Sequence, residues 1–200
     1  MADLEEDDLI YCYRGTQVLK NTYGEQNPEN LAKLERILCG ARLVDLLHKP
    51  LKGKFDAVHL RKIHHYIFQD LYTWAGKYRV IEIAKGYYFC RSQYVPRETD
   101  KLMLELQAEN YLRSTQERDL PYRAAYYLGE INAIHPFRDG NGRTQREFIR
   151  ELLLPLGFTV LYAKVAPRMM FEASVESFQG NNDKMIELFK TCITPLSELK

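Results

Sequence analysis

The 200-residue sequence has no excess of either charge: 28 lysines and arginines face 27 aspartates and glutamates, and the formal net charge is +1. It also lacks a cluster of basic residues, so we expect no direct binding of nucleic acid and no attachment to a membrane surface. It contains neither an apolar run of transmembrane length nor a positively charged leader segment. These absences lead us to expect a cytoplasmic protein.

Cysteine is sparse, and its spacing matches no metal or redox motif. The four cysteines are scattered without a CxxC pair. This argues against a zinc site and favours free thiols in a reducing compartment. Internal repeats and low-complexity segments are absent too. With 46% hydrophobic residues, a chain of this length suits one compact domain.

Hydrophobic periodicity predicts a mainly α-helical fold. Residues 79–83 instead alternate polar and β-branched side chains, Lys85-Gly86 is a turn signal, and residues 87–90 look extended. This change of period predicts one β-hairpin in an otherwise helical chain. Helices are expected over residues 18–22, 28–49, 57–71, 97–113, 121–134, 144–154, 167–178 and 182–193.

Residues 135–146, His-Pro-Phe-Arg-Asp-Gly-Asn-Gly-Arg-Thr-Gln-Arg, collect the groups needed to bind a phosphate. The Gly-Asn-Gly run can take positive φ and present backbone N–H groups to one point, next to a helix N-terminus. Arg143 and Arg146 share a face of that helix. Asp139 is a hard oxygen ligand that suits Mg²⁺, and His135 can take a proton near neutral pH. Together they predict phosphoryl or nucleotidyl transfer.

Each of these residues also has a simpler explanation. Alone, His135 would be an ordinary histidine at a helix C-terminus, and Asp139 the cap of a turn. Arg143 and Arg146 could form surface ion pairs with Glu147 or Glu151 of their own helix. The close succession of all four groups around a phosphate nest favours the functional interpretation. The other four histidines lack partners at ligand spacing, and we expect them on the surface or satisfied by hydrogen bonds.

The same run matches every specified position of HPFx[D/E]GNGRxxR and so resembles the motif of the Fic family. Residues 74–79, Trp-Ala-Gly-Lys-Tyr-Arg, resemble the family's [F/W]AGxxR segment, which precedes a target-binding flap. The resemblance covers about residues 13–189. It implies a mainly α Fic fold, a helical bundle with one β-hairpin flap over the active site. We expect a flexible N-terminal segment at 1–12, the Fic domain at 13–194 and a C-terminal tail at 195–200.

The family resemblance also implies an activity, the transfer of AMP from ATP to a protein hydroxyl with release of pyrophosphate. His135 would then be the catalytic base for a target Tyr, Ser or Thr hydroxyl, and Asp139 the ligand of Mg²⁺. Pro136 and Phe137 would support the loop structurally. The nucleotide-binding residues would be Gly140, Asn141, Gly142, Arg143 and Arg146.

Two further sets of site residues are implied by the resemblance. In the family the flap binds the target as an added strand, which uses backbone hydrogen bonds and tolerates sequence variation. The flap contacts are then expected from Ile83, Lys85, Gly86 and Phe89. The adenine pocket is expected near four polar residues: Glu176, Gln179, Asn181 and Asn182. A polar helix end with its caps is an almost equally good explanation of these residues.

Regulation is the point at which the sequence departs from much of the family. Many Fic proteins carry an inhibitory helix, [S/T]xxxE[G/N], whose glutamate pairs with the second motif arginine. Residues 194–198 have this spacing, but Leu199 replaces the final Gly or Asn, and Pro195 disfavours a helix. The chain thus resembles the toxin subgroup, in which a small antitoxin supplies the helix; a type II topoisomerase is the target class by analogy alone. Transfer of another phosphate-containing group, removal of AMP and non-catalytic ATP binding stay open as alternatives.

Overall fold

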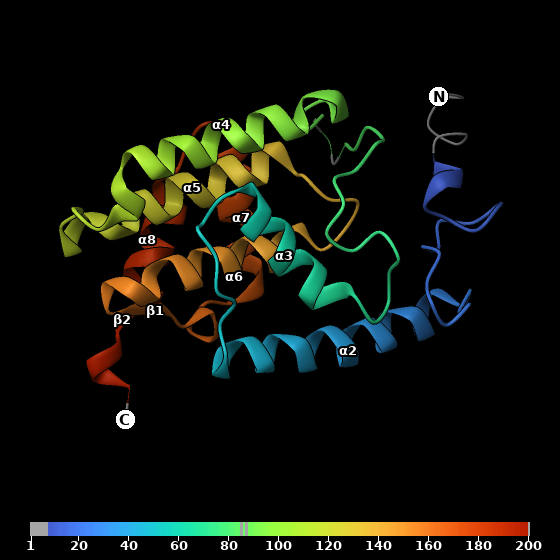
Figure 1. Ribbon diagram of the computed structural model, residues 1–200, viewed down its shortest axis with the longest axis horizontal. Coiled ribbons are helices and arrows are strands. Elements are labelled where there is room, and N and C mark those ends of the chain that lie inside the picture. Colours follow the sequence, from blue (N-terminus) through green and yellow to red (C-terminus); the bar gives the residue numbers. More distant parts are fainter. Residues whose placement is uncertain (1–7, 85, 87, 200) are drawn as a thin grey trace.

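The computed structural model describes residues 8–84, 86 and 88–199. Helix α5 lies at the centre of the bundle, where it packs against α4, α6, α7 and α8 (Figure 1). Helix α2 runs along the lower edge of the view and packs against α3. The helices are α2 (Pro28–His48), α3 (Ala57–Phe68), α4 (Val95–Ala108), α5 (Leu120–Ile134), α6 (Asn141–Leu153), α7 (Pro167–Phe178) and α8 (Asp183–Cys192).

The predicted mainly α fold is confirmed, and local capping explains where two of the helices begin. Asn27 precedes α2, and its side chain accepts hydrogen bonds from the N–H groups of the first turn. Asp56 caps α3 in the same way, with 2.8 Å between its carboxylate and the nitrogen of His59. The helix expected at residues 18–22 is wrong, because this stretch is extended and Leu19 forms an antiparallel bridge with Cys12.

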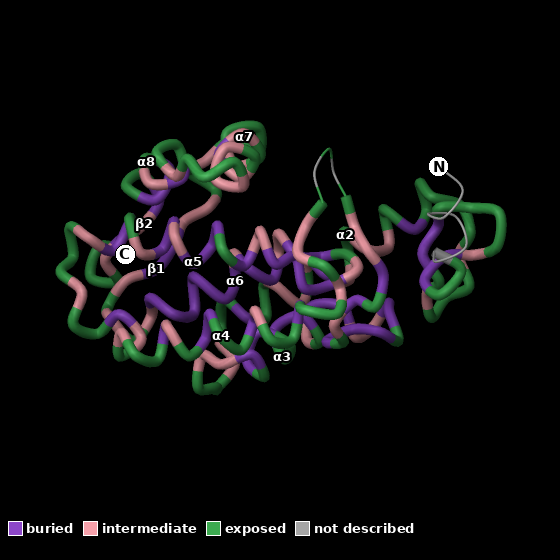
Figure 2. Tube along the Cα trace, turned by 90° about the horizontal axis from the view of Figure 1, so that it is seen from above, coloured by how far each residue is buried: buried purple, intermediate pink, exposed green. Residues whose placement is uncertain are grey.

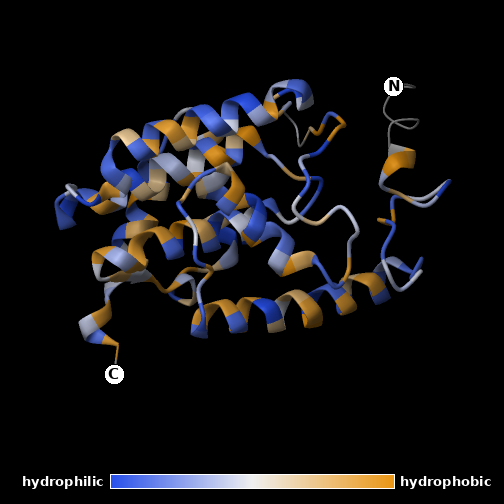
Figure 3. Ribbon diagram, viewed as in Figure 1, coloured by the Kyte–Doolittle hydropathy of each residue, from blue (hydrophilic) through white to orange (hydrophobic). Residues whose placement is uncertain are grey.

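The hydrophobic core lies between the faces of α3, α4, α5, α6 and α8. Hydrophobic and hydrophilic residues alternate along these helices in short stretches (Figure 3), as expected for helices that bury one face. Figure 2 shows long buried stretches in α5 and α6, which therefore place their connecting loop on a rigid base. Tyr11 and Cys12 are buried as well. Residues 1–7 lie outside the described part, and the expected domain boundaries stay a prediction.

Regular β-structure is limited in the described residues to a two-stranded antiparallel sheet, in which β1 (Phe158–Val160) pairs with β2 (Ile193–Pro195). The predicted hairpin covers residues 79–90, and residues 80–90 are called the flap segment below. Among its described residues, Ala84 and Tyr88 form one antiparallel bridge, and the N–H of Phe89 donates to the carbonyl of Ile83. Lys85 lies outside the described residues. No described helix combines the length and the apolar character that a membrane span requires.

Candidate active site

The motif loop, residues 135–142, connects the end of α5 to the start of α6. His135 terminates α5 in a left-handed conformation, with φ 49° and ψ 61°, and its N–H donates to the carbonyl of Ile131. Gly140 precedes α6 with φ 76°, and a Cβ atom there would lie 2.2 Å from the ring of Phe68. Only glycine meets both conditions at this position. Helix α6 thus begins at Asn141, three residues before the predicted start, and aims its N-terminus at the loop.

Asn141 braces the loop with its side chain. Its Oδ1 accepts from the backbone N–H of Phe137 at 2.9 Å, and its Nδ2 donates to the carbonyl of the same residue at 2.7 Å. The ring of Phe137 is fully buried. Asn141 itself does not take the positive φ that the Gly-Asn-Gly run allows, since positive φ falls on Gly140 and His135. Asn141 instead shapes the loop through two hydrogen bonds.

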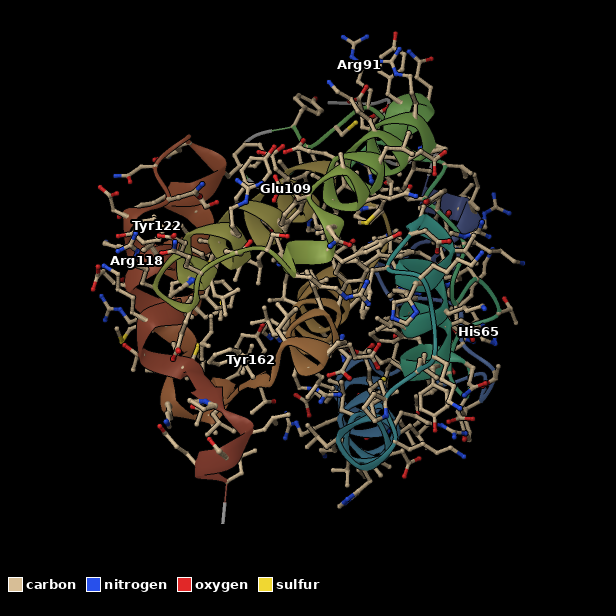
Figure 4. The ribbon with its side chains drawn as sticks, turned by 60° about the vertical axis from the view of Figure 1, so that its left-hand side comes forward. His65, Arg91, Glu109, Arg118, Tyr122 and Tyr162 are labelled. Carbon is tan, nitrogen blue, oxygen red and sulfur yellow. The ribbon has the colours of Figure 1, made fainter. Side chains whose placement is uncertain are left out.

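His64 fixes the loop from beneath, and its role was missed by the sequence analysis. Its Nδ1 accepts from the N–H of Gly76 at 2.8 Å, so its Nε2 must donate to the carbonyl of Asp139, 3.0 Å away. The ring stacks on Phe137 with 3.9 Å between centroids. Burial lowers the pKa of His64 to about 3, so the ring stays neutral. The adjacent His65 faces elsewhere and bonds to the carbonyl of Ala75 (Figure 4).

A cavity of about 210 Å³ lies over the motif loop. Its wall contains the predicted base His135, the predicted metal ligand Asp139 and every motif residue predicted to bind the nucleotide, but none of the four residues expected at the adenine pocket. Ile83 of the flap segment reaches it too, and so does Arg138, to which the sequence analysis assigned no role. The structure therefore brings the chemistry-bearing residues of the motif to one hollow.

The two motif arginines differ in their partners. Arg143 is held by Glu35 of α2, with 2.6 Å between Nη2 and Oε1. Among the residues that the structure describes, Arg146 has no carboxylate within ion-pair distance, and burial lowers the pKa of its guanidinium. Tyr162 (Figure 4) donates its hydroxyl to the backbone carbonyl of Arg146, 3.1 Å away. Arg146 therefore offers its charge to the cavity.

The alternative ion pairs along α6 do not form. Glu147 pairs with Arg150 at 2.5 Å, and Glu151 contacts His59 at 2.8 Å. Both pairs are buried under the helix, away from the motif arginines. Glu147 and Glu151 are therefore engaged in buried ion pairs and do not neutralise the two motif arginines.

Asp139 combines capping with access to the cavity. Its Oδ1 accepts from the N–H of Gly140 at 2.5 Å, as the simpler explanation predicted. Half of its side chain is nevertheless exposed, and the same oxygen lies 3.9 Å from Nη2 of Arg143. No group of three or more His, Cys, Asp or Glu side chains that could hold a metal occurs in the described part of the chain. A metal ion here would be held by this carboxylate together with oxygens of a bound phosphate and of water.

His135 is oriented by contacts on three sides. Its Nδ1 lies 3.4 Å from the carbonyl of Asn132, to which it can donate in the tautomer that leaves Nε2 as the acceptor nitrogen. The ring of Phe89 stacks on it, with 3.8 Å between centroids and 14° between the planes. The carbonyl of His135 accepts from Nε of Arg79 at 2.7 Å. The imidazole is thus fixed before any substrate binds.

Arg79, from the segment that follows Trp74, joins the flap segment to the loop. The guanidinium is fully buried and donates to the carbonyls of Ile81 and Cys90, at the two ends of the flap segment. It also donates to the carbonyls of Ile134 and His135. Its interactions with these four residues are all with backbone oxygens, so one side chain ties the base of the flap segment to His135.

The comparison with known families decides what kind of domain this is. The sequence profile of the Fic/DOC family matches residues 54–153, which is half of the 200-residue chain. This chain belongs to the Fic/DOC family.

Relatives of this Fic chain agree in name and in fold. "Protein adenylyltransferase VbhT" of Bartonella schoenbuchensis is 38% identical over 97% of the chain, which spans 41% of that longer relative. "Probable protein adenylyltransferase y4lH" of Sinorhizobium fredii is also 38% identical, with 88% of this chain and 90% of the relative aligned. The crystal structure of BepC from Bartonella tribocorum, with bound AMPPNP, is 30% identical. It has a TM-score of 0.88 and covers 93% of this chain and 97% of the other.

The four residues expected at the adenine pocket of this Fic domain lie at the junction of α7 and α8. Glu176 pairs with Lys184 at 2.5 Å, and Oδ1 of Asn182 accepts from the hydroxyl of Ser177 at 2.6 Å. Asn181 accepts from the first N–H of α8. The backbone N–H of Gln179 closes the last turn of α7. These contacts join the end of α7 to the start of α8, and a role in adenine binding stays a prediction.

Proposed function

We propose that this Fic domain is a protein adenylyltransferase, which moves AMP from ATP to a Tyr, Ser or Thr hydroxyl of a target protein. The observation that carries the proposal is the single cavity that holds a histidine base, a glycine-rich nest at a helix N-terminus, two arginines and a carboxylate. The names of the relatives and the AMPPNP bound to BepC support this choice of nucleotide. ATP is the substrate of the reaction.

The reaction uses the chain's residues in three places. Nε2 of His135 takes the proton of the target hydroxyl, whose oxygen attacks the α-phosphorus while the bond to the β-phosphate breaks. Backbone N–H groups at Asn141 and Gly142 face the phosphates at the N-terminus of α6, while the N–H of Gly140 donates to the carboxylate of Asp139. Arg143 and Arg146 stabilise the charge that builds up on the departing pyrophosphate. Most of the acceleration comes from this positioning.

Mg²⁺ fits this site through one carboxylate. The half-exposed side chain of Asp139 stands at the cavity wall, and Mg²⁺ is commonly bound by one or two carboxylates together with phosphate and water oxygens. The ion, when bound, neutralises charge on the phosphates. Asp139→Asn should therefore shift the Mg²⁺ titration to higher concentration and lower turnover by about tenfold or more. An unchanged titration and rate would leave Asp139 with its capping role alone.

The flap segment supplies the place for the target in this proposal. The bridge between Ala84 and Tyr88 has Gly86 in its turn, and Ile83 and Phe89 are the residues next to it outside the turn. Lys85 falls outside the described residues. A target segment that adds as a strand here would present its hydroxyl next to His135, because Phe89 stacks on that ring. Backbone pairing would make the flap tolerant of target sequence.

A small antitoxin in trans is the proposed regulator. Residues 194–198, whose spacing resembles the inhibitory helix, lie in β2 and in a short 3-10 turn. Thr194 is buried in the sheet. An inhibitory helix from another chain is thus the simpler source of control. The proposal concerns the domain, and the longer VbhT relative shows that Fic domains of this kind occur in larger chains.

The experiment that tests the function is incubation of the purified domain with labelled ATP and a bacterial lysate, followed by mass spectrometry of labelled proteins. A type II topoisomerase would be added in a separate reaction. AMP on a hydroxyl is the expected product. Phosphate or another group on the target would favour the alternative transferases, loss of AMP from a pre-modified target would favour removal of AMP, and ATP binding without turnover would favour a non-catalytic protein.

A further inference from the structure

Glu35 lies outside the family profile and 108 positions before its partner Arg143 in sequence. Its carboxylate uses both oxygens. Oε1 accepts from Nη2 of Arg143 at 2.6 Å, and Oε2 accepts from the hydroxyl of Tyr72 at 2.5 Å. One carboxylate of α2 thus connects a motif arginine to a buried tyrosine.

The guanidinium of Arg143 is also supported on its face. It lies over the ring of Phe68, 4.6 Å from the centroid, and Phe68 is the buried ring on which Gly140 rests. The side chains of Arg143 and Glu35 are only 26% and 19% exposed. A charged hydrogen bond in so sheltered a place is stronger and more directional than a surface pair. The direction of Arg143 is therefore set by the protein.

Arg143 and Arg146 divide the task between them. The carboxylate of Glu35 neutralises the charge of Arg143. No carboxylate among the described residues neutralises Arg146 in this way. The net attraction for a polyphosphate then comes mainly from Arg146 and the helix N-terminus. Arg143 contributes N–H donors at a fixed place, which matters most when charge develops at one oxygen.

We propose that Glu35, with Tyr72, is a positioning residue that aims Arg143 at the leaving pyrophosphate. This inference rests on the proposed AMP transfer. Glu35 touches no reacting atom and acts through Arg143 alone. Loss of the carboxylate should leave Arg143 charged but free to rotate, so that it binds the ground state almost as well and the transition state less well.

The kinetic test compares Glu35→Ala with Glu35→Gln. Glu35→Ala should lower kcat about tenfold and change KM for ATP less than threefold. Glu35→Gln should recover most of kcat, because the amide oxygen still accepts from Arg143. The matched control is Asp70→Ala. It breaks the 2.7 Å ion pair between Asp70 and Arg42, which lies on α2 like Glu35. This control should destabilise α2 without a change in kcat.

Two further measurements separate positioning from loss of structure and from failure of the proposed function. In an Arg143→Ala background, Glu35→Ala should have no additional effect on kcat. Calorimetry should show that Glu35→Ala and Glu35→Gln, which both leave the charge of Arg143 uncancelled, raise the ratio of ATP to AMP affinity up to threefold, whether or not the wild type transfers AMP. Wild-type inactivity with this pattern would end the proposed function and leave Glu35 as a partner of Arg143 in nucleotide binding. A kcat that is unchanged or higher in Glu35→Ala, or effects that add in the double variant, would overturn the inference.

Discussion

The motif loop and the flap segment face the same cavity but are built in opposite ways. The loop is held by Asn141 within itself, by His64 from α3 and by the packing of Gly140 on Phe68. The described residues of the flap segment form one bridge, between Ala84 and Tyr88, and contact the rest of the domain through Arg79 at the base and through Phe89, which stacks on His135. The difference separates two requirements: the phosphates need a fixed cradle, whereas a protein target needs an edge that accepts many side chains.

The largest effect is expected at the catalytic end of the fixed loop. His135→Ala should lower AMP transfer at least about a hundredfold, because it removes the base, whereas the affinity for ATP should stay within about threefold. Rates with labelled ATP and calorimetric ATP binding give the two numbers. Near-normal labelling of the target would show that the loop's rigidity serves binding alone.

The second effect concerns the free energy of unfolding and tests the contact of His64 with the motif loop. Burial lowers the pKa of His64 to about 3, below the ordinary value of 6.5. Between these two pH values the unfolded chain binds a proton that the folded chain rejects. The free energy of unfolding contributed by this group is therefore complete above about pH 6.5 and falls as the pH is lowered towards 3.

His64→Gln removes this titration and keeps an N–H donor for the carbonyl of Asp139. Urea unfolding between pH 7 and pH 4 should then show a shallower loss of stability in the variant than in the wild type. The difference between the two curves isolates His64 from the carboxylates that titrate in the same range. Equal slopes would mean that His64 is not held neutral under the loop.

A smaller effect is expected on the other side of the comparison, in the flap segment. Ile83→Ala removes a side chain but leaves the backbone on which an added strand would pair. We expect kcat/KM for a target protein to fall less than about fivefold, measured at saturating ATP. A loss as large as that of His135→Ala would show that the flap recognises its target through side chains. It would contradict the difference drawn above between the motif loop and the flap segment.

The smallest effect is expected in a region that belongs to neither the loop nor the flap. Glu198 lies in a 3-10 turn after β2, and the preceding Pro195 is extended. Glu198→Gly should leave autoAMPylation unchanged at equal protein concentration with ATP and Mg²⁺. A strong gain would place an inhibitor in this chain and remove the need for one in trans.

The sequence predicted what local chemistry decides and missed what tertiary contact decides. The start of α7 at Pro167 and the caps Asn27 and Asp56 follow from residues next to one another in the chain. His64 and Glu35 act on the motif from 75 and 108 positions away. Adjacent histidines and a glutamate in a mixed helix give no local signal for such roles, and only the packing of α2 and α3 against the loop reveals them.

The extent of strand in the flap and the start of α6 differ from the prediction for local reasons. A Gly-Asn-Gly run favours loops by propensity, yet Asn141 enters the helix because its side chain is bonded to Phe137 at both ends. The alternation at residues 79–83 is typical of a strand, but a strand needs a partner along its length, and the described flap residues supply one bridge.

Arg79 anchors the flap segment through carbonyl oxygens, a feature that every residue type shares. The exposed side chains of Ala84 and Tyr88 can therefore be exchanged without disturbing the anchor, whereas Glu82 pairs with Arg79 and Phe89 stacks on His135. Descendants of such a chain could acquire new targets by changing the flap alone, while inheriting the chemistry intact. The buried arginine thus separates the evolution of specificity from the evolution of catalysis.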